Sequence, residues 1–189
     1  PFNPHGTCQP GGIYYSTAQH ILSFTDYGPW IRIVTIPKNA QTYKDPDGDK
    51  WKANKIILGK RRKLCSVAVF KELIKQGADI HADNDFALRY ASANGHLDVV
   101  KYLVSKGADI HADNDFALRF TSYNGHLSVV KYLLEQGAHI HADKDAALRY
   151  ASKYGHLSVV KYLVSKGADI HANKDAALRY ASDYGHLSV

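Results

Sequence analysis

Apolar residues in the second part of the chain recur in short bursts that repeat every 30 residues. A phrase that begins His-Ala starts at residue 81 and returns at residues 111, 141 and 171. Only positions 84, 86, 93, 94 and 98 differ between residues 81–110 and 141–170. A degenerate copy precedes the first phrase, and the last copy ends at residue 189. The sequence therefore predicts three full repeats with a partial repeat on each side.

Each repeat predicts two short helices. In the first repeat, Asp85 is expected to cap a helix that runs from residue 86 to Gly95, because its carboxylate can accept the free backbone N–H groups of the first turn. A second helix is expected at about 97–106, where apolar residues follow each other at three- and four-residue spacing, and Gly107 ends it. The link at Gly95 is so short that the helices must fold back as an antiparallel hairpin.

Stacking has to hold these hairpins together. Both helices fall short of the roughly 12 to 15 residues at which isolated helices become marginally stable. Small residues in the first helix, such as Ala87, Ala91 and Ser92, allow neighbouring first helices to approach closely. The sequence therefore predicts a mainly α solenoid in which each hairpin contacts only its neighbours.

The N-terminal part does not repeat. A short helix is expected at 18–24, a strand at 30–36, and a hairpin around the turn 45–49. We interpret residues 1–60 as a small α+β module that caps the apolar end of an array spanning residues 61–189. The glycine falls too early in the turn for a calcium loop, and position twelve is Ile56 rather than Glu.

Charge is placed unevenly along the chain. Residues 1–65 carry ten Lys/Arg and four Asp/Glu, whereas residues 66–189 carry fourteen of each. An acidic partner would therefore be attracted to the N-terminal module. The two cysteines, Cys8 and Cys65, are too few for a disulfide framework and favour a reducing intracellular setting. The chain starts at Pro1 without any methionine and stops inside a repeat, so we expect it to be a fragment. No apolar run is long enough for a membrane span.

The phrase G-H-L-x-V-V-K-Y-L-V-S-K-G-A-D-I-H-A, at 95–112, 125–142 and 155–172 with small changes, resembles the second-helix and turn signature of the ankyrin repeat. The resemblance covers about residues 66–189. The repeat is three residues shorter than the usual 33, and Phe-Ala-Leu-Arg or Ala-Ala-Leu-Arg replaces the usual Thr-Pro-Leu-His, so shortened turns are expected. Such repeats, and the opening G-G-I-Y-Y-S-T, are similar to ankyrin proteins of giant DNA viruses of the mimivirus type. That similarity implies a viral protein.

The resemblance also implies where a partner binds. Positions that vary between repeats match those that line the concave face in the ankyrin family: Asn84, Asn114, Lys144 and Lys174 in the turns, and Ala93, Asn94, Tyr123, Asn124, Lys153, Tyr154, Asp183 and Tyr184 at the ends of the first helices. Tyrosine is enriched at protein interfaces. Neutral drift among recently duplicated repeats would also produce such differences.

Several groups of residues allow two interpretations. One is the basic cluster Lys60, Arg61, Arg62 and Lys63. It is either a patch that binds nucleic acid or directs nuclear import, or a solvated linker between the two modules, and we favour the linker. Arg89 and its three counterparts bind an acidic partner or, as we favour, neighbouring turns. Cys65 is a buried small residue or a thiol with a lowered pKa. Recurring histidines indicate bonds to the backbone rather than a metal site, since successive turns should stand on the order of 10 Å apart.

The predicted function is a scaffold that binds a protein partner through the concave face of the array. No constellation of catalytic residues is present, so no enzymatic activity and no cofactor are expected. The alternative function is nucleic-acid association or nuclear targeting through the basic N-terminal module. We expect a monomeric protein in the cytoplasm of a host cell, or in its nucleus.

Overall fold

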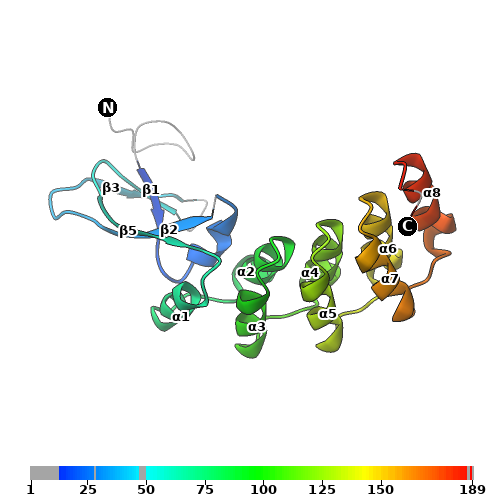
Figure 1. Cartoon of the computed structure of the whole chain (residues 1–189). Coiled ribbons are helices and arrows are strands. Elements are labelled where there is room, and N and C mark those ends of the chain that lie inside the picture. The colour runs from blue at the N-terminus through cyan, green and yellow to red at the C-terminus, as the bar shows by residue number, and fades with distance from the viewer. Residues whose placement is uncertain (1–12, 28, 47–49, 187, 189) are drawn as a thin grey trace. The chain divides into compact units, whose positions relative to one another are not determined.

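A computed structural model describes residues 13–27, 29–46, 50–186 and 188. The chain divides into two compact units, residues 1–79 and 80–189 (Figure 1). The described residues contain eight α-helices, and the strands all lie in the first unit. None of these helices is both long enough and apolar enough to cross a bilayer.

The first unit is built from two small antiparallel sheets and one α-helix. One sheet has the strand order β1-β4-β3 and the other pairs β2 with β5. The elements are β1 (Ile13–Ser16), the 3₁₀ helix η1 (Ile21–Tyr27), β2 (Trp30–Thr35), β3 (Thr42–Lys44), β4 (Lys50–Ala53), β5 (Ile57–Lys63) and α1 (Val67–Lys75). The predicted strand and the predicted hairpin are confirmed as β2 and β3–β4. The helix predicted at 18–24 is the 3₁₀ helix η1, which begins three residues later than predicted.

The basic cluster is not a linker, as the sequence analysis favoured. Lys60 to Lys63 form the end of β5, which pairs with β2 in the register Trp30↔Lys63 and Arg32↔Arg61. The module boundary predicted at residue 60 falls inside this strand. Cys65, expected to be buried, is exposed.

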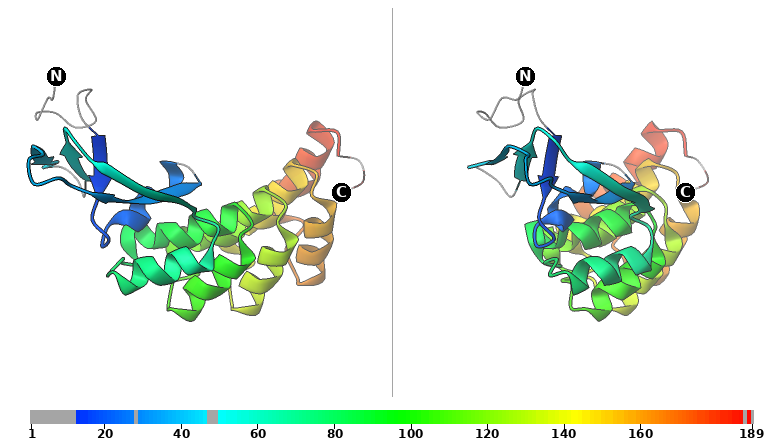
Figure 2. Two further views of the ribbon diagram at one scale, coloured as in Figure 1. Left: turned by 60° about the vertical axis from the view of Figure 1, so that its left-hand side comes forward. Right: turned by 90° about the vertical axis from the view of Figure 1, so that its left-hand side faces the viewer.

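The second unit is the predicted solenoid of helix pairs (Figure 2). Each first helix starts within the turn that joins two repeats, and each second helix follows the glycine at the end of the first helix. The first helices are α2 (Ala82–Ala93), α4 (Ala112–Tyr123), α6 (Ala142–Lys153) and α8 (Ala172–Asp183), and the second helices are α3 (Leu97–Ser105), α5 (Leu127–Glu135) and α7 (Leu157–Ser165).

Close packing of the first helices determines the curvature of this unit. Successive first helices contact each other extensively, whereas successive second helices touch at few points. The small side chains at the contact, including Ala87, Ala91 and Ala117, are almost completely buried. Because one row of helices is packed more tightly than the other, the first helices lie on the inner side of the curve.

Each first helix begins with three consecutive residues in the left-handed conformation. In α2 these are Asp83, Asn84 and Asp85, with φ values of 52°, 52° and 54°. This conformation costs roughly 1–2 kcal/mol per residue for most side chains, and Asp and Asn tolerate it best. The left-handed run is how a repeat shortened to 30 residues still returns the chain to the start of the next helix.

Asp85 does not act as the predicted cap of its own helix. Its carboxylate is buried and accepts the backbone N–H of Asp109 at 2.9 Å, while the Nδ1 atom of His81 lies 3.2 Å away. Residue 109 follows α3, so the bond joins the two ends of one helix pair. Asp115 and Asp145 make the same bond in the following repeats, at 2.8 and 2.9 Å.

Arginine holds the left-handed turn in place. Arg89 donates through Nε to the carbonyl of Asn84 at 2.9 Å and through Nη2 to that of Asp83 at 2.8 Å. Its Nη1 atom also lies 3.3 Å from the carboxylate of Asp113 in the next turn. Arg119 and Arg149 repeat the two carbonyl bonds. These contacts agree with the favoured interpretation of the arginines as ligands of neighbouring turns.

A histidine and a glycine join each repeat to the next. His156 places its Nε2 atom 2.8 Å from the carbonyl of Tyr123, and His126 approaches that of Ala93 in the same way, at 3.1 Å. The ring of His156 covers Gly125, where an added Cβ would lie 2.6 Å from Nδ1. Gly125 also has a φ of +76°. The histidine before each second helix therefore bonds to backbone, as predicted, and requires a glycine beneath its ring. The prediction was wrong for the turn histidines, whose rings lie against aspartate carboxylates instead.

Replacing Gly125 by alanine is expected to destabilise the array by about 2–5 kcal/mol. The left-handed backbone contributes roughly 1–2 kcal/mol and the overlap with His156 about 1–3 kcal/mol. Gly137 is the matched control, because its φ is +99° and an added Cβ would meet nothing within 4 Å. Gly137→Ala should show the backbone cost alone in urea unfolding.

The double variant Gly125→Ala/His156→Ala isolates the overlap. Once the ring is absent, the additional cost of Gly125→Ala should disappear, because only the backbone strain is left. An equal cost with and without His156 would show that the ring does not restrict this position.

Candidate protein-binding surface

Aromatic side chains gather along the first helices α4, α6 and α8. They sit three or four residues apart on each helix, so they share one face. We call the following set the aromatic strip: Phe116, Phe120, Tyr123, Tyr150, Tyr154, Tyr180 and Tyr184. Tyr154 and Tyr184 directly follow α6 and α8, at the helix ends.

Ring contacts link the strip within and between repeats. Phe116 and Phe120 stack at 3.9 Å between ring centroids, with their planes only 7° apart. Phe120 and Tyr123 of α4 both meet Tyr150 of α6 edge-on, at 6.2 and 6.1 Å. Tyr123 also lies 4.2 Å from Tyr154. The rings therefore form a continuous surface across the boundary between two repeats.

Lys153 extends this surface to the last repeat. Its Nζ atom lies 5.4 Å from the ring of Tyr154, 5.9 Å from that of Tyr180 and 5.0 Å from that of Tyr184. A hydrogen bond to the Tyr184 hydroxyl is the main reason why the pKa of Lys153 is raised. The ammonium group thus stays charged while three aromatic rings surround it, which is a favourable cation–π arrangement.

Tyr123 and Tyr154 form a hydrogen bond between their hydroxyls. This bond raises the pKa of Tyr123 and lowers the pKa of Tyr154. Lys153 further lowers the pKa of Tyr154. Tyr154 and Tyr184 remain exposed at 37% and 54%, and the other rings of the strip are half-buried. Rings held in this way present apolar area with little freedom left to lose on binding.

The predicted partner-binding residues fall into two separate places. The helix-end positions of the last three repeats adjoin one another, and Tyr123, Lys153, Tyr154 and Tyr184 belong to the strip or touch it. The turn residues are exposed in the left-handed turns at the opposite ends of the same helices, roughly one helix length or 12 Å away. Asn124 bonds instead to the carbonyl of Ala93 at 2.8 Å and so links two repeats.

Sequence reasoning missed Phe120, Tyr150 and Tyr180. They occupy the same position of each repeat, which hardly changes and so was not among the variable positions. Their spacing of three or four residues from the predicted tyrosines was the signal that could have found them.

The basic cluster of β5 is divided between two faces of its strand. Arg61 and Lys63 lie against the ring of Trp30, at 4.0 and 5.5 Å from its centroid. Arg62 points elsewhere and forms a 2.6 Å ion pair with Glu72, whose pKa it lowers. The four residues therefore do not form one patch.

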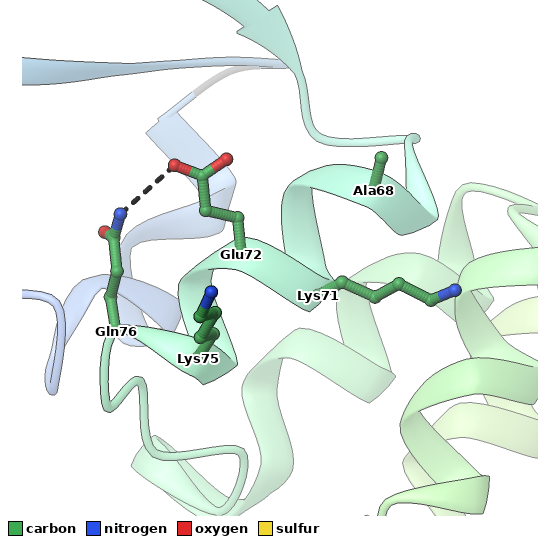
Figure 3. A pocket seen from close by; sticks show the side chains of 5 residues that line it. All are labelled: Ala68, Lys71, Glu72, Lys75 and Gln76. Atoms are coloured by element: carbon green, nitrogen blue, oxygen red, sulfur yellow. Dashed lines mark hydrogen bonds between the residues drawn. The ribbon is translucent and has the colours of Figure 1, made fainter.

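One hollow on the described surface, of about 520 Å³, is lined by Ala68, Lys71, Glu72 and Lys75 of α1 and by Gln76, which directly follows it (Figure 3). Glu72 accepts a hydrogen bond from Gln76 at 3.1 Å. Of the three aspartates that superficially suggest calcium, Asp47 and Asp49 lie outside the described residues.

Helix pairs of fixed length, stacked through small residues and ended by glycines, define a helical-repeat protein. The family model described as "Ankyrin repeats (3 copies)" matches residues 60–144 and 118–189. The chain belongs to the ankyrin-repeat family.

Two similar proteins come from Acanthamoeba polyphaga mimivirus, and both are named "putative ankyrin repeat protein". One is 40% identical over 107 residues, which is 53% of this chain and 35% of that protein. The other is 32% identical over 101 residues, or 52% of this chain and 49% of that protein. The matched region thus spans half or less of these relatives. Giant-virus proteins are therefore among the relatives of this chain, as the sequence resemblance implied.

Replacing Tyr123 by phenylalanine is expected to raise the pKa of Tyr154. The donor that stabilises the Tyr154 phenolate is removed, so this hydroxyl should lose its proton at a higher pH. Titration of the ¹³Cζ resonance of Tyr154 measures the change. Tyr162→Phe, on the second helix α7, is the control and should leave that pKa unchanged. A pKa of Tyr154 that does not respond to Tyr123→Phe would contradict the hydrogen bond.

Proposed function

We propose that the array captures a protein partner through the aromatic strip, and that this chain is part of a viral protein that acts on host or viral factors. The ankyrin repeat is a general protein–protein interaction fold. The single observation that carries the proposal is the continuous set of ring contacts from Phe116 to Tyr154, which Lys153 extends to Tyr184.

The chemistry of the strip favours a protein over other ligands. Tyrosine offers both an apolar ring and a hydroxyl, and such residues dominate the binding energy of protein interfaces. The strip lies on the inner side of the curved array, where a partner can reach several repeats at once. Positive charges lie against the rings: Lys153 at Tyr154 and Tyr184, and Arg119 and Arg149 at Phe116 and Tyr150. We therefore expect a partner segment with apolar side chains and at least one carboxylate.

The family is typical of scaffolds without enzymatic activity. The hydroxyls of Tyr123 and Tyr154 bind each other, and that of Tyr184 binds Lys153. We therefore propose a binding role and no catalytic one.

Replacing Tyr123, Tyr154 and Tyr184 together by alanine is expected to abolish partner capture, because the exposed rings supply the contact area. Tagged chain is used to capture proteins from infected-cell lysate, and quantitative mass spectrometry compares the two forms. Proteins that bind through the strip should fall by at least about tenfold, the loss expected from removing one interface hot spot.

The matched control carries the same number of tyrosine-to-alanine changes on the second helices, at Tyr102, Tyr132 and Tyr162. These side chains are also half-buried but lie in the other row of helices. The control should capture the same proteins as the unchanged chain, and circular dichroism checks that all variants keep their helices. Capture that survives the strip variant would rule out this surface.

A second candidate function is nucleic-acid association through β2 and β5. One observation favours it: Trp30 is 41% exposed and is flanked by Arg61 and Lys63. Basic side chains around an exposed aromatic ring are a typical arrangement for single-stranded nucleic acid, since the charges bind phosphate and the ring stacks on a base.

If this candidate is right, binding of a labelled single-stranded oligonucleotide should weaken steeply with salt. Each neutralised phosphate contributes about 0.7 to the slope of log K against log salt, so Arg61→Gln/Lys63→Gln should reduce the slope by about 1.4. Lys55→Gln/Lys60→Gln removes the same charge from residues that do not contact Trp30 and should reduce it less. Equal effects of both pairs would indicate attraction by net charge alone.

A further inference from the structure

One position breaks the repeat in a way that changes the local chemistry. The residue before Ile-His in each turn is Asp109 or Asp169 in two repeats, but His139 in the repeat between them. The aspartates use their side chains locally: each accepts the backbone N–H two residues later, at 2.8 Å. A histidine ring cannot reproduce that turn, and His139 is directed toward the preceding turn instead.

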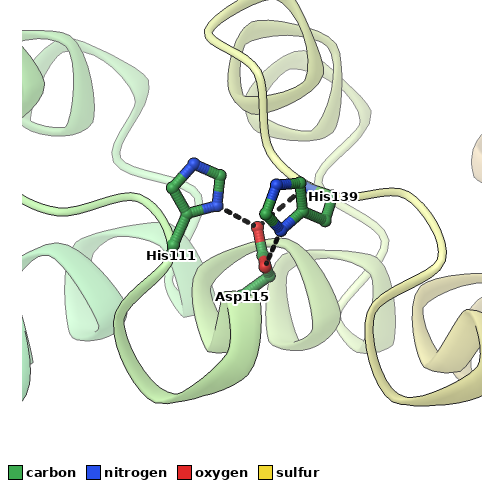
Figure 4. A group of neighbouring side chains, drawn as sticks. All are labelled: His111, Asp115 and His139. Carbon is green, nitrogen blue, oxygen red and sulfur yellow. Dashed lines mark hydrogen bonds and ion pairs between the residues drawn. The ribbon is translucent and has the colours of Figure 1, made fainter.

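His139 thereby joins His111 and Asp115 (Figure 4). The Nδ1 atom of His111 lies 3.1 Å from Oδ1 of Asp115, and the Nδ1 atom of His139 lies 3.3 Å from Oδ2. The two imidazole rings stack with their centroids 4.2 Å apart. The three potential ligand atoms all lie within 4.8 Å of one another. Among the described residues, this is the one such group of three.

The distances from the two Nδ1 atoms to oxygens of Asp115, 3.1 and 3.3 Å, match those between neighbouring ligands of a bound zinc ion. The other separations, at most 4.8 Å, would shorten as the ion binds. An ion about 2.1 Å from each of three ligand atoms, with angles between about 90° and 110°, separates neighbouring ligand atoms by about 3.0–3.4 Å. Imidazole nitrogen and carboxylate oxygen are both common zinc ligands. The metal would replace the Nδ1 protons, and each ring would then carry its proton on Nε2.

The surroundings hold the carboxylate in position and leave room for water. The side chain of Asp115 is only 2% exposed, and the backbone N–H of His139 donates to its Oδ1 at 2.8 Å. Such bonds from outside the ligand set orient a metal-binding carboxylate. The side chains of His111 and His139 are 41% and 70% exposed. Solvent can therefore enter and fill the remaining coordination positions.

We propose that His111, Asp115 and His139 form a zinc site that clips together the two ends of the second full helix pair. His111 and Asp115 stand at the start of α4 and His139 follows α5, so one ion links the entry and exit of this repeat. The site lies at the turn end of the first helices and is independent of the aromatic strip. The sequence analysis considered only His139 with His141, and histidines of successive turns, and therefore predicted no metal site.

The test is zinc titration of tag-free chain by isothermal calorimetry, after treatment with chelator. The unchanged chain should bind one zinc ion per chain at this site. His139→Asp should lower the affinity at least about tenfold, because one of three protein ligands is lost. This variant keeps the fold, since Asp occupies the same position in the repeats on both sides, and thermal unfolding without zinc checks that it does.

Two matched variants sharpen the result. His141→Ala removes an exposed histidine two residues away and should leave the affinity unchanged. Asp109→His should add a second site, because His81 and Asp85 already hold the corresponding geometry: the Nδ1–Oδ1 distance is 3.2 Å, and the N–H of residue 109 donates to Asp85 at 2.9 Å. The number of zinc ions bound per chain should then rise from one to two.

Zinc should also raise the unfolding temperature of the unchanged chain but not that of His139→Asp, because a ligand stabilises only the state that binds it. Imidazole nitrogen resonances should show the metal on Nδ1 of His111 and His139. Absence of binding by the unchanged chain would overturn the proposal. So would binding that His139→Asp leaves intact, which would place the ion on other histidines.

Discussion

A buried carboxylate at the start of α2, α4 and α6 is the interaction on which the array depends. A carboxylate out of contact with water is costly unless donors surround it. Asp85 obtains its donor from the backbone just beyond the next helix, and this bond closes the helix pair. The Asp85 carboxylate can reach that position only because the backbone forms the left-handed turn. This turn requires the two bonds that Arg89 donates to its carbonyl groups. Aspartate, turn and arginine therefore act as one unit in every repeat.

The aspartate bond closes each helix pair at the start of its first helix, and the other end of that helix makes the contacts between repeats. There the histidine of one repeat bonds to the last carbonyl of the previous first helix, over a glycine that has no side chain. These contacts bring the first helices close together and orient their ends in parallel. Side chains at corresponding positions then meet across repeats, which is why Tyr123 can touch both Tyr150 and Tyr154.

The sequence was sufficient to predict the features that recur in every repeat. It was insufficient to predict contacts between residues that lie far apart along the chain. Apolar spacing and glycines located the helices, because these depend on neighbours within one repeat. The role of Asp85 was mistaken for a cap because its partner lies 24 residues ahead. Lys60 to Lys63 were mistaken for a linker because strand pairing with Trp30 to Thr35 is equally distant in sequence. The approach of His139 to His111 likewise depends on how one turn stacks on the next.

The recurring bonds span the same number of residues in each copy, 24 for the aspartate within a helix pair and 33 for the histidine between pairs. A segment of 30 residues could therefore be inserted or deleted in frame, and the newly adjacent units would meet through contacts already present elsewhere. Gene duplication can thus lengthen the molecule without any compensating mutation. In such a protein, the length of the array changes with the number of repeats. The chemistry of its surface changes separately, through single substitutions such as the one at His139.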